Sequence, residues 1–195
     1  MIKLTSLDKK YESCRCFFTS NNILVVGGKS DEQNEIVLTD FIKPNYIIMH
    51  TSLPGSPFMI IQSDNPSKKD IEETAIYCAC FSQQWKSGKR LIEVDIFKGE
   101  HIYKTKTMKT GTFGVKGNKK TIRVKPELVL VIQNGKLRAV PKTKELEVLA
   151  EVKQGNLTKE QAAEKISKII KDKFHFPVSR DEIMAAIPSG KLSVK

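Results

Sequence analysis

The sequence has no long hydrophobic run. No stretch approaches the roughly 18 consecutive apolar residues that a membrane span requires, although 39% of the 195 residues are hydrophobic. The first residues, MIKLTSLDKKYE, include acids and no continuous apolar stretch. They match neither a secretory signal nor an acid-poor transit peptide. We therefore predict a soluble, cytoplasmic protein with no membrane partner.

Cysteine and histidine are scarce. The sequence has four cysteines in two Cys-x-Cys pairs and three widely spaced histidines: Cys14, Cys16, Cys78, Cys80, His50, His101 and His175. Paired thiolates are good zinc ligands, but two helix positions that are two apart point in different directions, so Cys78 and Cys80 are poorly placed to hold one ion. Buried thiols are the more ordinary interpretation. Zinc binding by the pairs stays open, but we predict no metal site, no cofactor and no enzymatic activity.

Acidic residues are absent from one long segment. The formal net charge is +11, yet residues 1–85 contain 8 Lys or Arg and 10 Asp or Glu. Residues 86–125 contain 12 basic residues and 3 acids, and the stretch from Lys104 to Lys125 has eight bases and no acid. A solvated lysine-rich face normally carries acids among its bases. A segment without acids therefore indicates a polyanionic partner.

The order of apolar segments and turn residues predicts an α+β fold, with a mixed or antiparallel sheet and a few packed helices. Ser30 and Gln33 have the spacing of a capping box at a helix start, and apolar residues recur at steps of three and four from Ile71 to Trp85. Trp85 is predicted to lie in the core. We predict a hairpin over 11–26, helices over 30–39 and 71–85, and strands over 46–49, 58–62 and 91–97 and near Ile102, Thr112 and Val129.

The sequence changes character after residue 135. The polar stretch 136–144, with one proline, predicts a linker. Beyond it, three apolar residues over 146–152 predict a short helix, and the capping signals at Thr158 and Ser179 predict two more. We therefore predict a main domain over 1–135, a linker over 136–144 and a small helical extension over 145–195.

The tripeptide Gly28-Lys29-Ser30 looks like the end of a phosphate-binding P-loop. That motif requires a glycine five positions before Gly28, where this chain has Ile23, so a nucleotide hydrolase is excluded. A glycine turn into a helix N-terminus still presents backbone N–H groups and the positive end of the helix dipole to an anion. We predict that Gly27, Gly28 and Lys29 contact one phosphate, with a purely structural turn as the alternative.

The stretch KTKTMKTGTFGVKGNKKTIRVK begins at Lys104 with lysine and threonine in alternation, which predicts a strand. Both residue types bind phosphate oxygens, glycines let a backbone approach closely, and Phe113 is able to stack on an unpaired base or to lie in the core. Asn34 and His50 are predicted to make specific polar contacts. The lysines predicted to meet a nucleic-acid backbone are Lys104, Lys106, Lys109, Lys116, Lys119 and Lys120.

These residues resemble a known family, the RNA-binding domain at the C-terminal end of NFACT proteins. The resemblance rests on four blocks: FTS from Phe18, ILVVGGKSDEQNE from Ile23, IIMHTSLPGSPFMII from Ile47 and TGTFGVKGNKK from Thr110. The chain departs from the family after the paired glycines, where members often carry Arg then Asp. It also has His-Thr-Ser-Leu-Pro-Gly from His50, where members often read His-Ala-Asp-Leu-His-Gly.

The resemblance implies that residues 1–135 bind RNA, with tRNA or rRNA as partner and the large ribosomal subunit as a further one. Large members of the family act in ribosome-associated quality control, bind obstructed large subunits and tRNA, and support C-terminal tailing of stalled nascent chains. We expect 195 residues to be too few for their remaining domains, so we carry over RNA binding and not tailing. The oligomeric state stays open. The alternative function is an adaptor that docks on an acidic protein.

Overall fold

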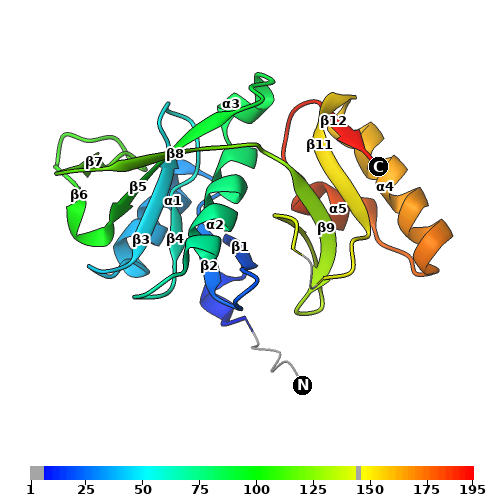
Figure 1. The fold of residues 1–195 in the computed structure, drawn as a ribbon, viewed down its shortest axis with the longest axis horizontal. Coiled ribbons are helices and arrows are strands. Elements are labelled where there is room, and N and C mark those ends of the chain that lie inside the picture. The colour runs from blue at the N-terminus through cyan, green and yellow to red at the C-terminus, as the bar shows by residue number, and fades with distance from the viewer. Residues whose placement is uncertain (1–6, 144–145) are drawn as a thin grey trace.

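The structure is a computed structural model that describes residues 7–143 and 146–195. It confirms the predicted α+β class, with antiparallel sheets and five α-helices in the described residues (Figure 1). Within that part of the chain, no helix combines the length and the apolar character needed to span a bilayer.

The first sheet has six strands in the order β1-β2-β4-β3-β5-β8, and each neighbouring pair is antiparallel. The strands are β1 Arg15–Phe18, β2 Leu24–Gly27, β3 Ile47–Thr51, β4 Met59–Ile61, β5 Ile92–Lys98 and β8 Lys120–Val124. Short elements flank them: 3-10 helices Lys9–Tyr11 and Gly99–His101, and the pair β6 Ile102–Tyr103 and β7 Gly114–Val115. The predicted hairpin is confirmed, and Asn22 takes the left-handed conformation in its turn, with φ 59°.

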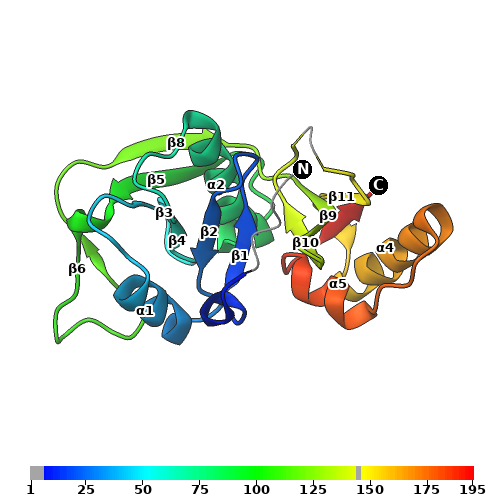
Figure 2. The same ribbon diagram turned by 90° about the horizontal axis from the view of Figure 1, so that it is seen from below.

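Two helices cover opposite faces of this sheet (Figure 2). Helix α1, Asp31–Asp40, begins where predicted, because the Ser30 side chain accepts a hydrogen bond from the Gln33 N–H. Helix α2, Lys68–Cys80, lies on the other face. The single helix predicted over 71–85 is wrong: the chain leaves helical geometry at Phe81, and Ser82 then caps a separate short helix, α3, Gln83–Lys86.

A second sheet has the order β10-β9-β11-β12. Because β9 lies in the predicted main domain, the extension begins before the predicted boundary, and we use the name C-terminal extension for residues 128–195 from here on. Its elements are β9 Leu128–Gln133, β10 Lys136–Val140, β11 Ala150–Leu157 and β12 Leu192–Val194, with helices α4 Lys159–Phe174 and α5 Arg180–Ala186. Both helices were predicted from their caps. In the structure Thr158 and Ser179 form complete capping boxes with the side chains three residues later.

The linker predicted over 136–144 is wrong for residues 136–140, which form β10. This strand pairs with β9 around a two-residue turn in which Asn134 and Gly135 have φ values of 52° and 72°. Such a turn matches the twist of two antiparallel strands. Lys144 lies outside the described residues.

The short helix predicted over 146–152 is also wrong. Ala150 begins β11, which pairs with β9 on one side and β12 on the other. Three apolar residues do not compensate the free-energy cost of nucleating a helix. Pairing with the edge of β9 instead satisfies the backbone hydrogen bonds of this segment. The extension is therefore a sheet with two helices and not a helical tail.

The main body and the extension share one hydrophobic core. A single cluster runs from α2 and the first sheet into β9, β11 and α4. Trp85, only 2% exposed, belongs to it as predicted, and its carbonyl accepts a hydrogen bond from Gln154 Nε2 at 2.9 Å. At the edge of β1, Gln133 bonds both backbone groups of Phe18, at 2.8 and 2.7 Å. The extension thus covers a strand edge that is otherwise open to pairing.

All four cysteines are buried free thiols. Burial raises the pKa of Cys78 to about 12, so this thiol stays protonated and is a poor metal ligand near neutral pH. Among residues 7–143 and 146–195, no group of three or more His, Cys, Asp or Glu side chains is placed to hold a metal ion.

Candidate nucleic-acid interface

The basic segment, residues 104–120, is mostly a loop and not the predicted strand. Hydrogen bonds from Met108 N to Thr105 O, at 3.1 Å, and from Thr112 N to Lys109 O, at 3.0 Å, close two turns. These turns use backbone groups that a strand ladder needs. The alternation of lysine and threonine therefore reflects an exposed loop here.

Lys104 holds this loop against α1. Its Nζ donates to Glu35 Oε2 at 2.7 Å, to the Lys109 carbonyl at 2.8 Å and to the Thr112 carbonyl at 3.1 Å. An ammonium group has three donors, and all three are used. Lys104 therefore has a structural contact, and no donor is left for a phosphate.

Glu35 and Lys104 together tether the loop to α1, because Glu35 Oε2 also accepts from the Gly111 N–H at 2.7 Å. These hydrogen bonds, first from Lys104 and then from Gly111, lower the pKa of Glu35. Gly111 is required at this position: its φ is 74°, and a β-carbon would lie 2.7 Å from the Asp31 Cα. The start of α1 and the basic segment are thus in direct contact.

Glu35→Gln is expected to release the loop, because one charge-assisted hydrogen bond to Gly111 and the ion pair to Lys104 are lost. Amide exchange at Gly111 should become about tenfold faster. Hydrogen exchange followed by NMR measures this directly. Asp40→Asn makes the same charge change at the far end of α1 and should leave the Gly111 rate unchanged. Equal rates in the two variants would contradict the tether.

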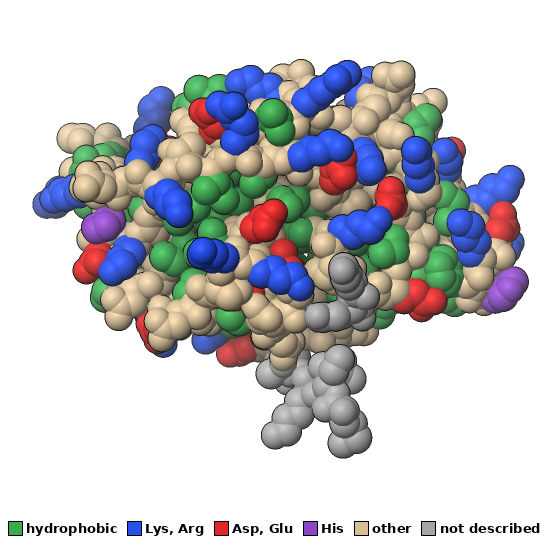
Figure 3. Space-filling model, in the orientation of Figure 1, with side chains coloured by type: hydrophobic (Ala, Val, Ile, Leu, Met, Phe, Trp, Pro, Cys, Tyr) green, Lys and Arg blue, Asp and Glu red, His purple; other side chains and the backbone are tan. Residues whose placement is uncertain are grey.

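The other lysines of the segment are more available. Lys106, Lys109 and Lys120 are exposed and make no ion pair with a described residue. Lys116 Nζ lies 4.8 Å from the centroid of the Tyr103 ring, a cation–π contact that leaves its donors free. On the face drawn in Figure 3, Lys and Arg side chains are scattered with acids among them. Four lysines of the basic segment are without an ion-pair partner among the described residues: Lys106, Lys109, Lys116 and Lys120.

A cavity of about 600 Å³ lies next to the segment and brings together three of the predicted site residues, Asn34, His50 and Lys119. The rings of Phe58 and Phe113 line it as well. Their centroids are 6.0 Å apart in an edge-to-face arrangement, so Phe113 packs on the core and still faces the cavity. We call this cavity the His50 cavity.

His50 presents one hydrogen-bond acceptor to the cavity. Its Nδ1 lies 2.7 Å from the Thr51 carbonyl, and since a carbonyl only accepts, Nδ1 must carry the proton. The ring packs on Phe58 with centroids 4.5 Å apart. Burial lowers the pKa of His50, and the Thr51 carbonyl and the charge of Asp95 oppose this only in part. The neutral ring leaves Nε2 as an acceptor, suited to a base amino group or a ribose hydroxyl.

An NMR titration of His50 should give a pKa below its ordinary value of 6.5. Because the folded pKa is lower than the unfolded one, protonation favours the unfolded chain: the stabilising contribution is complete above pH 6.5 and declines as the pH falls toward the folded value. The ring-proton shifts of the native and urea-unfolded protein provide the comparison, with His50→Gln to assign the signal. A folded pKa above the unfolded one would contradict the buried neutral ring.

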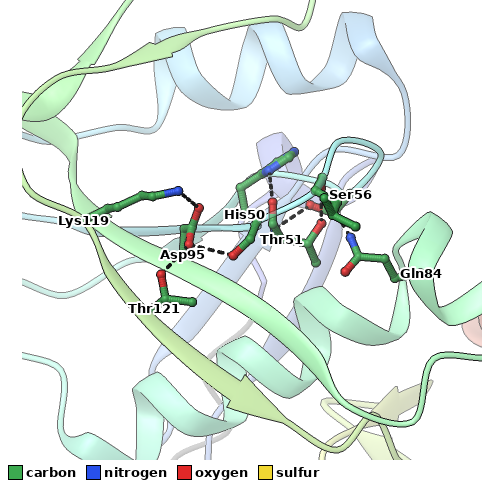
Figure 4. Close-up of polar contacts among 9 residues, drawn as sticks. His50, Thr51, Ser56, Gln84, Asp95, Lys119 and Thr121 are labelled. Atoms are coloured by element: carbon green, nitrogen blue, oxygen red, sulfur yellow. Dashed lines mark hydrogen bonds and ion pairs between the residues drawn. The ribbon is translucent and has the colours of Figure 1, made fainter.

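Asp95, on β5, pairs in register with His50 on β3 and organises the polar contacts beside it (Figure 4). Its carboxylate accepts from Lys119 Nζ at 2.6 Å and from the hydroxyls of Ser52 and Thr121, each at 2.7 Å. Burial raises the pKa of Asp95, but these three hydrogen bonds outweigh it and the net pKa is lowered. Lys119 is thereby held beside the cavity with about half of its side chain exposed, 53%, and with two donors still free.

The glycine turn before α1 has a packing reason. A β-carbon on Gly28 would lie 2.6 Å from the Asn34 backbone nitrogen, and one on Gly27 would meet Phe58 O at 2.9 Å. Asn34 Oδ1 accepts from the Phe58 N–H at 3.4 Å, which ties α1 to β4. Gly28 and Lys29 do not line the His50 cavity; they line a neighbouring one.

Comparison with known proteins identifies the family. The model of the NFACT protein RNA binding domain matches residues 13–117, which include the glycine turn, the lining of the His50 cavity except Lys119, and most of the basic segment. The chain belongs to this family. The match ends before Lys119 and Lys120, and the C-terminal extension lies outside it.

Curated relatives extend the likeness. The chain is 29% identical over 184 residues to the archaeal Rqc2 homolog aRqcH of Methanocaldococcus jannaschii, covering 87% of this chain and 27% of that protein. It is 29% identical over 119 residues to the human ribosome quality control complex subunit NEMF, covering 56% of this chain and 11% of that one. This NFACT RNA-binding domain protein thus spans about a quarter or less of each of these two relatives.

A solved structure shares the fold. The C-terminal part of the fibronectin/fibrinogen-binding protein from Streptococcus suis superposes with a TM-score of 0.53 and 23% identity, over 63% of this chain and 48% of that one. At this identity the likeness concerns the fold alone.

Two residues of the interface, Asp95 and Glu35, were not predicted from the sequence. Asp95 carried a signal, because it is one of two acids, with Glu93, in the otherwise apolar run Ile92 to Phe97, and a charge in a buried strand needs a partner. Glu35 carried none, since acids on an exposed helix are ordinary.

Proposed function

We propose that this protein binds RNA through the basic segment and the His50 cavity, and that it acts as a binding module without catalysing a reaction. The observation that supports this best is the placement of a family-matched cavity beside unpaired lysines. Lys116 and Lys120 meet phosphates, while His50 and Asn34 face the nucleoside.

We further propose that the RNA is tRNA or rRNA on the large ribosomal subunit, and that the protein takes part in ribosome-associated quality control in the cytoplasm. The support is the likeness to an Rqc2 homolog and to a ribosome quality control complex subunit. Both relatives are much longer, so their other activities are not carried over.

A matched pair of triple variants tests RNA binding. Lys106, Lys116 and Lys120 are changed to glutamine, and Lys119 is kept because it holds Asp95. The control changes Lys168, Lys171 and Lys173 of α4, which are equally exposed. Affinities for tRNA, single-stranded RNA and duplex DNA are measured at about 150 mM salt.

The first triple variant should lose at least about tenfold in affinity for tRNA, and the control should change little, because only the former removes phosphate contacts. If both variants lose affinity equally, or if duplex DNA binds as tightly as tRNA, the basic segment is only a nonspecific surface for anions. Capture of a protein that persists after nuclease treatment would favour the adaptor instead.

A further inference from the structure

A second cavity, of about 310 Å³, lies between the main body and the C-terminal extension and brings four basic side chains together. We call it the Arg15 cleft. Arg15 comes from β1, Lys29 from the turn before α1, Lys86 from α3 and Lys159 from the first residue of α4. Of these four residues, only Lys29 was predicted as a site residue from the sequence.

Glu160 follows Lys159 in α4 and partly offsets its charge, but no described acid pairs with the four cations. The only acid on the described lining is Asp31. Burial lowers the pKa of Lys159, and the positive charges of Arg15 and Lys86 lower it further. Burial and Arg15 likewise lower the pKa of Lys29. Gathering like charges in this way costs free energy unless an anion offsets it.

Arg15 is the most constrained of the four. Its guanidinium carbon lies 3.8 Å from the centroid of the Phe81 ring, which holds the planar group in place. Its Nε atom is buried and has no hydrogen-bond partner among the described residues. A buried donor without a partner is costly, and a guanidinium fork matches the oxygens of a phosphate.

The backbone around the cleft also favours a negatively charged ligand. Helices α1 and α4, of 10 and 16 residues, both begin on its lining, at Asp31 and Lys159. The N-terminal ends of helices carry partial positive charge. Gly28 lines the cleft as well.

We infer that the Arg15 cleft seats a phosphate group of the bound RNA, with Arg15, Lys29, Lys86 and Lys159 around it. The inference deepens the proposed function and rests on it for the source of the phosphate. The phosphate contact predicted at the glycine turn thus becomes part of a larger site, which also includes Arg15, Lys86 and Lys159.

The cleft continues the interface described above. It shares Asp31, Asn34, Gly55 and Ser56 with the His50 cavity. A strand whose base enters the His50 cavity therefore has a neighbouring phosphate within reach of the cleft. This gives the C-terminal extension a role in binding, because Lys159 belongs to it.

The test uses the full chain with Lys86 and Lys159 changed together to glutamine, because neither side chain makes a hydrogen bond or ion pair with a described residue and folding should be kept. Lys168 and Lys171, both on α4 and exposed, are changed together as the matched control. The cleft variant should lose roughly tenfold in affinity for single-stranded RNA, and its slope of log affinity against log salt should shrink by about 0.7, the contribution of one phosphate on a single strand. The control should stay within about twofold. Equal losses would overturn the inference.

Titration with inorganic phosphate separates this inference from RNA binding itself. The Gly28 amide signal of the wild-type protein should shift, and the Lys86 and Lys159 double variant should show no shift. If wild type binds RNA but phosphate leaves Gly28 unmoved and the double variant binds normally, the cleft is overturned and RNA binding stands. If phosphate shifts Gly28 but RNA does not bind, the proposed function fails, and with it RNA as the source of the phosphate.

Discussion

Raising the salt concentration from about 50 to about 200 mM should weaken RNA binding by roughly 100-fold to 500-fold. Each lysine that meets a phosphate displaces condensed counterions, which makes the affinity fall steeply with salt. The lysines of the basic segment that keep donors for phosphate are Lys106, Lys109, Lys116, Lys119 and Lys120. Five such contacts predict a slope of log affinity against log salt of about −3.5 to −4.5.

Fluorescence anisotropy of a labelled single-stranded RNA in a potassium chloride series measures this slope. Changing Lys106, Lys116 and Lys120 to glutamine should reduce its magnitude by about 2 to 3, whereas the α4 control triple should leave it unchanged. A slope near zero in the wild-type protein would show that the basic segment does not meet the RNA backbone.

Replacing Trp85 by alanine should lower the free energy of unfolding by about 3–5 kcal/mol, the cost of deleting a large buried ring. The ring is 2% exposed and belongs to the cluster that joins the main body to the extension. No smaller side chain fills that space. Chemical unfolding in urea, with the midpoint and slope fitted separately, measures the loss.

Leu91→Ala is the control for this prediction, because Leu91 is 56% exposed and only six positions away. Its cost should stay within about 0.5 kcal/mol. Trp85→Phe should fall between the two, since it keeps most of the ring and removes Nε1, a buried donor without a partner among the described residues. A loss for Trp85→Ala as small as that for Leu91→Ala would contradict its place in the core.

Local signals predicted much of the fold. Ser30 with Gln33, and Thr158 with Gln161, marked helix starts because a cap is made by residues within one turn of each other. The hairpin ending at Gly27 was predictable for the same reason: its turn and both strands are neighbours in the chain. The break at Phe81 was not predictable in this way. The apolar pattern from Ile71 to Trp85 fits one continuous helix as well as it fits two helices in succession.

The candidate site was predictable only in part. The absence of acids marked the basic segment. Asn34 and His50 were predicted from their polar character and position, and the structure brings them into one cavity. The role of Lys104 was not predictable, because its partner Glu35 lies 69 positions earlier. Asp95 and Lys119, 24 positions apart, meet only when β5 pairs with β8.

The sequence by itself determined the α+β class, the helix caps and the location of the excess positive charge, because each depends on residue type and near neighbours. The tertiary structure alone decided that residues 136–140 and 150–157 form strands of a second sheet, since their partners lie in β9 and β12. It also decided that four basic residues from four elements face one cleft. Convergence of that kind follows from the packing of two sheets and their helices, which no local pattern encodes.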